Sequence, residues 1–238
     1  MFKQLGLFVL ADVCYETVRG IAEGKEAIAF ANARFLIDVE SATGTYFEPD
    51  IQQALISQRW LIDASNFMYM NSHFILTTGF LVWLYLRRNE TFYFVRNMFM
   101  IAMAFALIGY TLMPTAPPRL IPGEGFVDTI TAYAQVNHDS ALVQIFVNPY
   151  AAVPSMHCAF SLMVGVTGAI VSRHRASKLF WGIYPALVFF VVVVTANHFW
   201  LDGAIGWAVA GLSALGALQL ARSRPAVWSF RPTAEARA

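Results

Sequence analysis

Residues 191–206, VVVVTANHFWLDGAIG, place two ionisable side chains at the junction of two long apolar runs. His198 and Asp202 lie four residues apart, so a helix through this stretch would carry both on one face. A carboxylate beside an imidazole orients the ring and makes it a better nucleophile or base. A polar pair that only caps a membrane helix would have the same spacing, so the rest of the sequence must decide between the two.

Two further polar segments interrupt the apolar sequence. One is Pro154-Ser155-Met156-His157, and the other runs from Pro114 to Arg119 as Pro-Thr-Ala-Pro-Pro-Arg. Ionisable groups are costly inside a membrane and are most often functional there. Three such segments in so apolar a chain favour one shared site.

The composition is that of an integral membrane protein. Apolar residues make up 58% of the chain and charged residues 13%, compared with about a half and a quarter in soluble domains. The formal net charge of +1 gives no basic field for nucleic acid. Cys14 and Cys158 lie in different apolar runs without metal-site or redox spacing, and we predict no metal ion and no other cofactor.

We predict an all-α fold: a polytopic six-transmembrane-helix bundle forming a single membrane domain, residues 1–238. Runs of about 20 apolar residues are long enough to cross the hydrocarbon core. The predicted spans are residues 2–21, 61–86, 97–113, 153–171, 179–195 and 201–220. Asp12 and Glu16 interrupt the first run, which argues against a cleaved signal peptide. Residues 23–60 have helical spacing of apolar residues among acids and amides, which predicts amphipathic interfacial helices. Residues 222–238 form a polar tail.

The distribution of basic residues predicts the orientation. Cytoplasmic connections carry an excess of Lys and Arg. Such residues gather in the second connection, the fourth connection and the tail, namely Arg87, Arg88, Arg96, Arg173, Arg175, Lys178, Arg222, Arg224, Arg231 and Arg237. Both termini are then cytoplasmic, and we expect the plasma membrane as the location. Arg119, His157 and His198 all fall on the extracytoplasmic face, and the 41 positions from His157 to His198 match one pass in and one pass back.

Each polar segment offers groups that suit a phosphate. Arg119 carries a fork of donors and follows Pro117 and Pro118, which stiffen the backbone; an interfacial Arg reaching toward lipid headgroups is the alternative. Ser155 is a candidate helix cap beside free backbone N–H groups, a favourable anion site. His157, in that first turn, would reach the same anion, or else would be a hydrogen-bonded core residue. We assign no role in the reaction to three other histidines, His73, His138 and His174.

Taken in chain order, the segments that contain Arg119, Pro154–His157 and His198–Asp202 resemble the type 2 phosphatidic acid phosphatase superfamily. Its pattern is Lys-x6-Arg-Pro, then Pro-Ser-Gly-His, then Ser-Arg-x5-His-x3-Asp. The resemblance is strongest in Pro154–His157 and in His198–Asp202, and it covers about residues 96–211.

The departures from that pattern concern mainly cations. The family Lys falls on Leu112, and the Ser-Arg pair of the third motif falls on Val191 and Val192. In addition, Arg119 is preceded rather than followed by Pro, and Met156 replaces a Gly. His198-Phe199-Trp200-Leu201-Asp202 is similar to the sphingolipid synthase and inositol phosphorylceramide synthase branch, which lacks the upstream Arg.

The resemblance implies a metal-independent lipid phosphatase or phosphotransferase. His198 would attack phosphorus to give a phosphohistidine, Asp202 would hold its ring, and His157 would exchange protons with the leaving and incoming oxygens. Arg119 and Ser155 would bind the phosphate of a lipid phosphate or phospholipid. Water as the acceptor would make the enzyme a phosphatase, whereas a lipid or inositol hydroxyl would make it a transferase.

Two other classes of protein fit parts of the sequence. A membrane zinc hydrolase could use His157, His198 and Asp202 as its ligands, although this leaves Arg119 and the Pro-Ser step unexplained. A non-catalytic transporter or lipid-binding protein is the second alternative. Its polar residues should lie along a path near the midplane of the bilayer rather than at one face.

Overall fold

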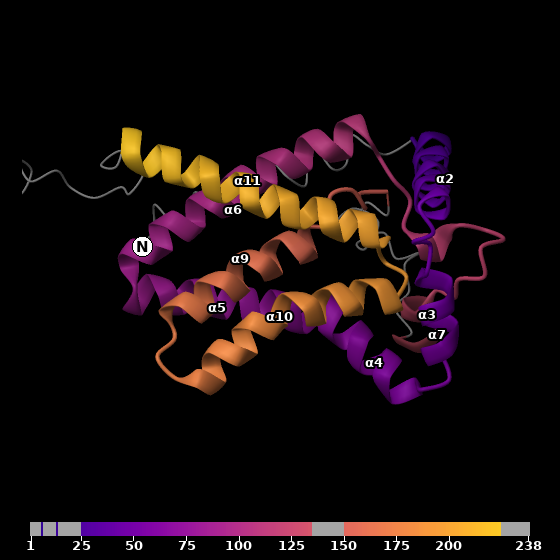
Figure 1. The fold of residues 1–238 in the computed structure, drawn as a ribbon, viewed down its shortest axis with the longest axis horizontal. Coiled ribbons are helices and arrows are strands. Elements are labelled where there is room, and N and C mark those ends of the chain that lie inside the picture. Colours follow the sequence, from indigo (N-terminus) through magenta and orange to yellow (C-terminus); the bar gives the residue numbers. More distant parts are fainter. Residues whose placement is uncertain (1–5, 7–12, 14–24, 135–149, 225–238) are drawn as a thin grey trace, which may run out of the picture.

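The computed structural model describes residues 6, 13, 25–134 and 150–224, and it is helical almost throughout (Figure 1). The helices of this part are α2 (Glu26–Ala42), α3 (Glu48–Leu55), α4 (Arg59–Phe67), η1 (Met68–Ser72), α5 (His73–Arg87), α6 (Asn89–Leu112), η2 (Pro118–Leu120), α7 (Thr129–Ala134), α9 (Met156–Val171), α10 (Arg175–Val194) and α11 (Trp200–Ser223). Extended pairing among the described residues is confined to an isolated bridge between Thr115 and Ala151. The predicted all-α class is therefore confirmed.

Three helices are long and apolar enough to cross a membrane. They are α6, α10 and α11, with 24, 20 and 24 residues. The predicted fourth span corresponds to α9, which is apolar but has 16 residues. These helices support a membrane protein, whereas the count of six spans stays a prediction because the first, residues 2–21, lies almost entirely outside the described residues.

The predicted second span contains a change of helix type. Residues 61–86 fall on α4, η1 and α5, which follow one another without a break. The middle piece, Met68–Ser72, is a π-helix. A π-helical turn shifts the register of the residues on either side, and such turns are frequent at functional sites.

Helix α9 occupies the middle of the bundle (Figure 1). It packs on α10, α11, α6 and α5. Its buried side chains, including Met163 and Val164, join those of α6 and α10 in the main hydrophobic core. A helix surrounded in this way holds its N-terminal residue, Met156, at a fixed place at one end of the bundle.

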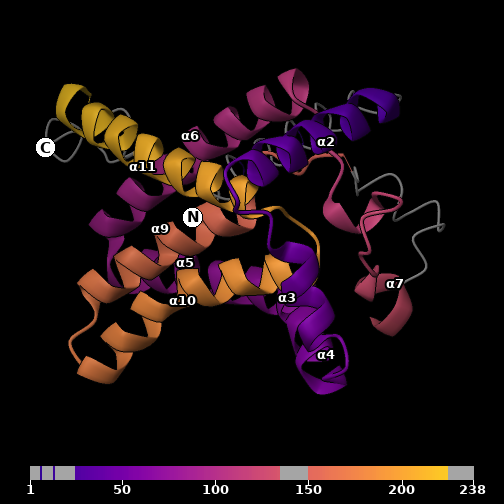
Figure 2. The ribbon, with the colours of Figure 1, turned by 45° about the vertical axis from the view of Figure 1, so that its right-hand side comes forward.

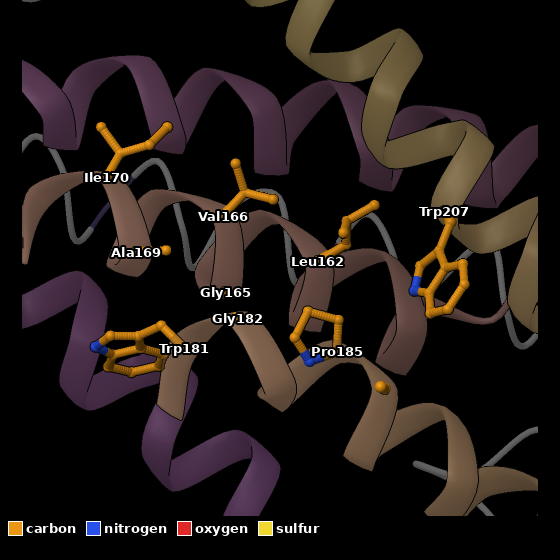
Figure 3. A pocket seen from close by; sticks show the side chains of 10 residues that line it. Leu162, Gly165, Val166, Ala169, Ile170, Trp181, Gly182, Pro185 and Trp207 are labelled. Atoms are coloured by element: carbon orange, nitrogen blue, oxygen red, sulfur yellow. The ribbon is translucent and has the colours of Figure 1, made fainter. Parts of the chain in front are cut away.

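Glycines allow α9 and α10 to approach closely. A Cβ on Gly165 would lie 2.7 Å from both the Cγ of Pro185 and the carbonyl oxygen of Trp181. Small residues at helix crossings permit this approach in membrane proteins. The same helices border a groove of about 370 Å³, which also includes Trp207 of α11 and is lined mainly by apolar side chains (Figure 3).

Helices α2 and α3 lie at the end of the bundle where α10 gives way to α11 (Figures 1 and 2). Ala29, Ala33 and Leu36 of α2 are buried in a second, smaller core. Phe199, fully buried just before α11, belongs to the same core. The predicted amphipathic segment therefore contacts the chain next to His198, and its location at a membrane surface stays a prediction.

The prediction that Arg96 lies in a cytoplasmic connection is wrong. This residue lies inside α6 and is fully buried. Its guanidinium donates to Oδ1 of Asn97, at 2.7 Å from Nη2, and lies over the ring of Tyr93. The helix begins seven residues earlier, at Asn89, so hydropathy set the predicted start of this span too late.

Close contact between α11 and α9 at Gly206 gives a test of this packing. A Cβ on Gly206 would collide with the carbonyl oxygen of Ser155, which belongs to the backbone and has little room to move. We expect Gly206→Ala to lower the free energy of unfolding by about 1–3 kcal/mol. Thermal unfolding in detergent measures this, with Gly211→Ala of the same helix as control, since nothing lies within 4 Å of a Cβ there. Equal melting temperatures for the two variants would contradict the packing.

Candidate active site

The connection from α10 to α11 is a tight turn that presents His198. The carbonyl oxygen of Val192 accepts the N–H groups of both Asn197, at 3.0 Å, and His198, at 3.2 Å. Ala196 has a φ of 52°, in the left-handed region that is uncommon for residues other than Gly. The chain thus reverses within five residues, and His198 lies just before the helix rather than on it.

His198 and Asp202 are in contact, as their spacing predicts. His198 Nδ1 lies 3.3 Å from Asp202 Oδ2, and the same oxygen accepts the N–H of Phe199 at 3.0 Å. The contact forms although His198 precedes α11, because Asp202 in the first turn points back toward it. An ionised Asp202 can only accept, and in that state Nδ1 would be the protonated nitrogen and Nε2 would carry the lone pair.

The His198 ring is buried and uncharged. Burial, together with the positive charge of Arg119, lowers the pKa of His198 to about 3, although the hydrogen bond to the Ala152 backbone opposes this effect. A neutral imidazole with a free nitrogen is the form that acts as a nucleophile.

The α9 N-terminus lies against the first turn of α11. Ser155 is the N-cap residue, and its Oγ accepts the N–H of Cys158 at 3.4 Å, as its sequence context predicts. The Ser155 N–H donates to the carbonyl oxygen of Asp202 at 3.1 Å. The N–H groups of Met156 and His157 have no acceptor within their own helix, as at any helix N-terminus, so they suit an anion.

His157 lies next to His198. Their ring centroids are 6.2 Å apart, a separation at which both rings can contact one phosphoryl group. The η1 turn orients His157, because the carbonyl oxygen of Tyr69 lies 3.2 Å from His157 Nε2. The Tyr69 ring stacks on the His157 ring at 4.2 Å. The π-helical turn in the second predicted span therefore serves this site.

Arg119 is anchored to the turn that carries His198. It lies in the short η2 helix, and its N–H donates to the carbonyl oxygen of Ala196 at 2.9 Å. Its Nε donates to Oδ1 of Asn197 at 2.9 Å, and its Nη1 lies 3.2 Å from Asp128 Oδ2. The structure thus brings all three polar segments together at one end of the bundle, while the roles of their residues stay predictions.

His73 is a neighbour of this site that the sequence did not reveal. Its Nδ1 lies 2.8 Å from the hydroxyl of Tyr184, and its ring centroid is 5.0 Å from that of His157. Its buried Nε2 has no hydrogen-bond partner among the described residues. No spacing rule links His73 with His157, because the contact depends on how α5, α9 and α10 pack.

The two positions where the resemblance expects additional cations hold apolar side chains. Leu112, at the end of α6, is 77% exposed, whereas Val192 of α10 is fully buried. Arg119 is consequently the cation that the described residues place beside His198, and backbone N–H groups at the start of α9 supply further donors.

The sequence matches the PAP2 superfamily over residues 34–216, from α2 to near the end of α11. Neither a search of curated proteins nor a search of solved structures found a match. The matched region contains all five residues of the site described above, namely Arg119, Ser155, His157, His198 and Asp202. Members of this superfamily are generally phosphatases, with activity on lipid phosphates. The chain therefore belongs to the PAP2 superfamily.

Proposed function

We propose that this protein is a membrane-embedded lipid phosphatase or phosphotransferase that works through a phosphohistidine. The observation that carries the proposal is the arrangement around His198. Asp202 contacts one ring nitrogen, the His157 ring centroid lies 6.2 Å from that of His198, and Arg119 is held through Asn197. This arrangement contains a nucleophile, a proton carrier and an anion-binding group.

In the first step, Nε2 of His198 forms a bond to phosphorus as the bond from phosphorus to the leaving oxygen breaks. The leaving oxygen keeps that electron pair and takes a proton from protonated His157. Asp202 stabilises the positive charge that develops on the His198 ring.

In the second step, neutral His157 removes a proton from the acceptor hydroxyl. The acceptor oxygen bonds to phosphorus, the N–P bond breaks, and His198 regains its electron pair. Arg119, Ser155 and the N–H groups of Met156 and His157 stabilise the charge on the non-bridging phosphoryl oxygens in both steps.

The acceptor decides between hydrolysis and transfer. Water is the acceptor in the phosphatase, which is the general activity of the superfamily and our first choice. The absent cations and the His198-Phe199-Trp200-Leu201-Asp202 sequence favour the inositol phosphorylceramide synthase-like branch, in which an inositol or lipid hydroxyl is the acceptor of a phospho-headgroup. The two reactions share the same residues, and the products distinguish them.

The geometry favours phosphate chemistry over the zinc alternative. Among residues 25–134 and 150–224, no three His, Cys, Asp or Glu side chains converge as metal ligands would. Moreover, Arg119 beside His198 would repel a dication, whereas it would attract a phosphate. The polar groups gather at one end of the helices, which also disfavours a transport path through the bilayer.

We also propose that the site faces the extracytoplasmic side, with both termini in the cytoplasm. Arg173 lies in the connection between α9 and α10, and Arg175 and Lys178 lie in the first turn of α10. Figure 1 shows this connection at the opposite end of the bundle from the turn between α10 and α11. The positive-inside rule then puts His198 outside.

The proposal is tested by incubating purified protein with phosphatidic acid, other phospholipids and polyprenyl phosphates, with and without diacylglycerol, ceramide or inositol. Free phosphate as the product identifies a phosphatase, and a new phosphodiester identified by mass identifies a transferase. We expect His198→Ala to abolish turnover because no other group can form the N–P bond. Its melting temperature should match the wild type. Turnover by His198→Ala, or no turnover of any lipid by the wild type, would refute the proposal.

Changing Asp202 to Asn tests the carboxylate. Asn keeps an acceptor for the Phe199 N–H but removes the charge that stabilises the imidazolium. We expect kcat to fall by roughly two to four orders of magnitude. An unchanged kcat would show that Asp202 only caps α11.

Cysteine labelling tests the orientation. Pro122 and Arg175 are both exposed. Each is replaced by Cys, one at a time, in a protein whose own Cys14 and Cys158 have been changed to Ala. On intact cells, a membrane-impermeant maleimide should label the cysteine at 122 and not the one at 175. The reverse pattern would place the chemistry in the cytoplasm.

A further inference from the structure

Three carboxyl groups satisfy the first backbone N–H groups of α11. The Phe199 N–H donates to Asp202 of the same helix. The Trp200 N–H donates to Oε1 of Glu48 at 2.7 Å, and the Leu201 N–H donates to Oε1 of Glu40 at 3.3 Å. N–H groups at a helix start lack intrahelical acceptors, and negative charge is favourable there. The chain immediately after His198 is therefore held by residues from other elements.

Glu40 and Glu48 come from parts of the sequence that are remote from α11. Glu40 is in the last turns of α2, and Glu48 opens α3. They lie 161 and 152 positions before their respective partners, and each is fully buried. A buried acid is costly unless it is hydrogen-bonded or neutral. These contacts are thus specific features of the fold.

The two glutamates also interact with each other. Their carboxyl groups accept from consecutive backbone N–H groups of α11, those of Trp200 and Leu201, which places the two carboxyls side by side. Oε2 of Glu40 is buried and receives no bond from any described donor. Two adjacent carboxyl groups share a hydrogen bond when one proton lies between them. A protonated Glu40 would donate through Oε2 and still accept the Leu201 N–H through Oε1.

The charged groups around the pair favour this shared proton. Asp202 faces it from α11, and both Asp202 and Glu48 act on Glu40 as negative charges. Tyr46, between α2 and α3, donates to Glu124 at 3.0 Å, which adds a third acid nearby. No Lys or Arg forms an ion pair with Glu40 or Glu48 in the described part of the chain. A proton therefore takes the place of a neutralising cation.

We propose that Glu40 and Glu48 are positioning residues, which share one proton and hold the first turn of α11 so that His198 and Asp202 are aligned for attack. The kcat measurements that test this proposal rest on the proposed function. The link is short, since His198 is two residues from Trp200, and the Trp200 ring stacks on Phe47 beside Glu48. A displacement of about 1 Å at a reacting group can reduce the rate by about 100-fold.

The shared proton gives the protein a defined pH dependence. Burial, followed by the charge of Glu48, raises the pKa of Glu40 from 4.5 to about 9. Burial also raises the pKa of Glu48, although the Trp200 N–H opposes this effect. The folded state thus holds a proton that the unfolded state releases, so the contribution to stability is complete below pH 4.5 and is lost as pH rises to about 9. Above that pH two adjacent carboxylates repel each other.

Glu40→Gln and Glu48→Gln separate the two roles. Gln at position 40 mimics the protonated acid, because its carbonyl accepts from Leu201 and its amide donates to Glu48. For Glu40→Gln we expect kcat near that of the wild type at pH 7. Toward pH 10, its kcat and melting temperature should fall less than those of the wild type. Gln at position 48 removes the charged acceptor of Trp200. We expect kcat to fall roughly 10–100-fold, with KM changed less than about threefold.

Asp38→Asn on α2 and Asp50→Asn on α3 are the matched controls, since both side chains are exposed and each lies two residues from the pair. They should keep the wild-type pH profile. The proposal is overturned if Glu40→Gln retains the wild-type alkaline loss, or if Glu48→Gln keeps full kcat. A loss of kcat that only follows the unfolded fraction would also overturn it, because the role would then be structural.

Two measurements distinguish this proposal from the proposed function. Melting temperature against pH for the wild type and Glu40→Gln tests the shared proton without any substrate. NMR of protein labelled with ¹⁵N-histidine tests alignment, because the His198 nitrogen shifts depend on its contact with Asp202. Shifts in Glu48→Gln identical to those of the wild type would refute the positioning role even if no lipid were turned over.

Discussion

The first turn of α11 has backbone N–H groups that no carbonyl of its own helix can satisfy, and the candidate site is assembled around the acceptors that satisfy them. Asp202 accepts one of these groups and also contacts His198. The carbonyl of Asp202 in turn accepts the N–H of Ser155, which ties the start of α9 to the start of α11. Glu48 and Glu40 accept the next two and attach α2 and α3 to the same turn. One helix start therefore sets the relative positions of nucleophile, proton carrier and anion site.

The apolar bundle supplies the rigidity that this arrangement needs. Helix α9 is enclosed by four neighbours, and glycines at its crossings with α10 and α11 bring the backbones close. Because packed helices resist small displacements, the residues at their ends keep their separations. The polar groups gather at one end of the bundle, where we propose that the phosphate headgroup of a lipid binds while its acyl chains remain in the membrane.

The described part of the site contains few cationic side chains. Apolar side chains stand where the family pattern has Lys and Arg, so in the proposed mechanism Arg119 and backbone N–H groups bind the phosphate. A neutral, buried His198 fits this setting, as does the proton that we propose Glu40 and Glu48 share, because both limit the number of buried charges. The protein thus combines the phosphatase-type site of the PAP2 superfamily with local features of its own.

The helical class, the membrane character, the contact between His198 and Asp202, and the capping role of Ser155 could all be predicted from the sequence. These follow from local rules, since hydropathy, four-residue spacing and helix-start chemistry act over a few residues. In contrast, the packing of the helices places Glu40, Glu48, His73 and Tyr69 near the site and buries Arg96 inside α6. Each of those contacts joins elements through packing or a π-helical turn, and no periodicity in the sequence records which buried face meets which helix end.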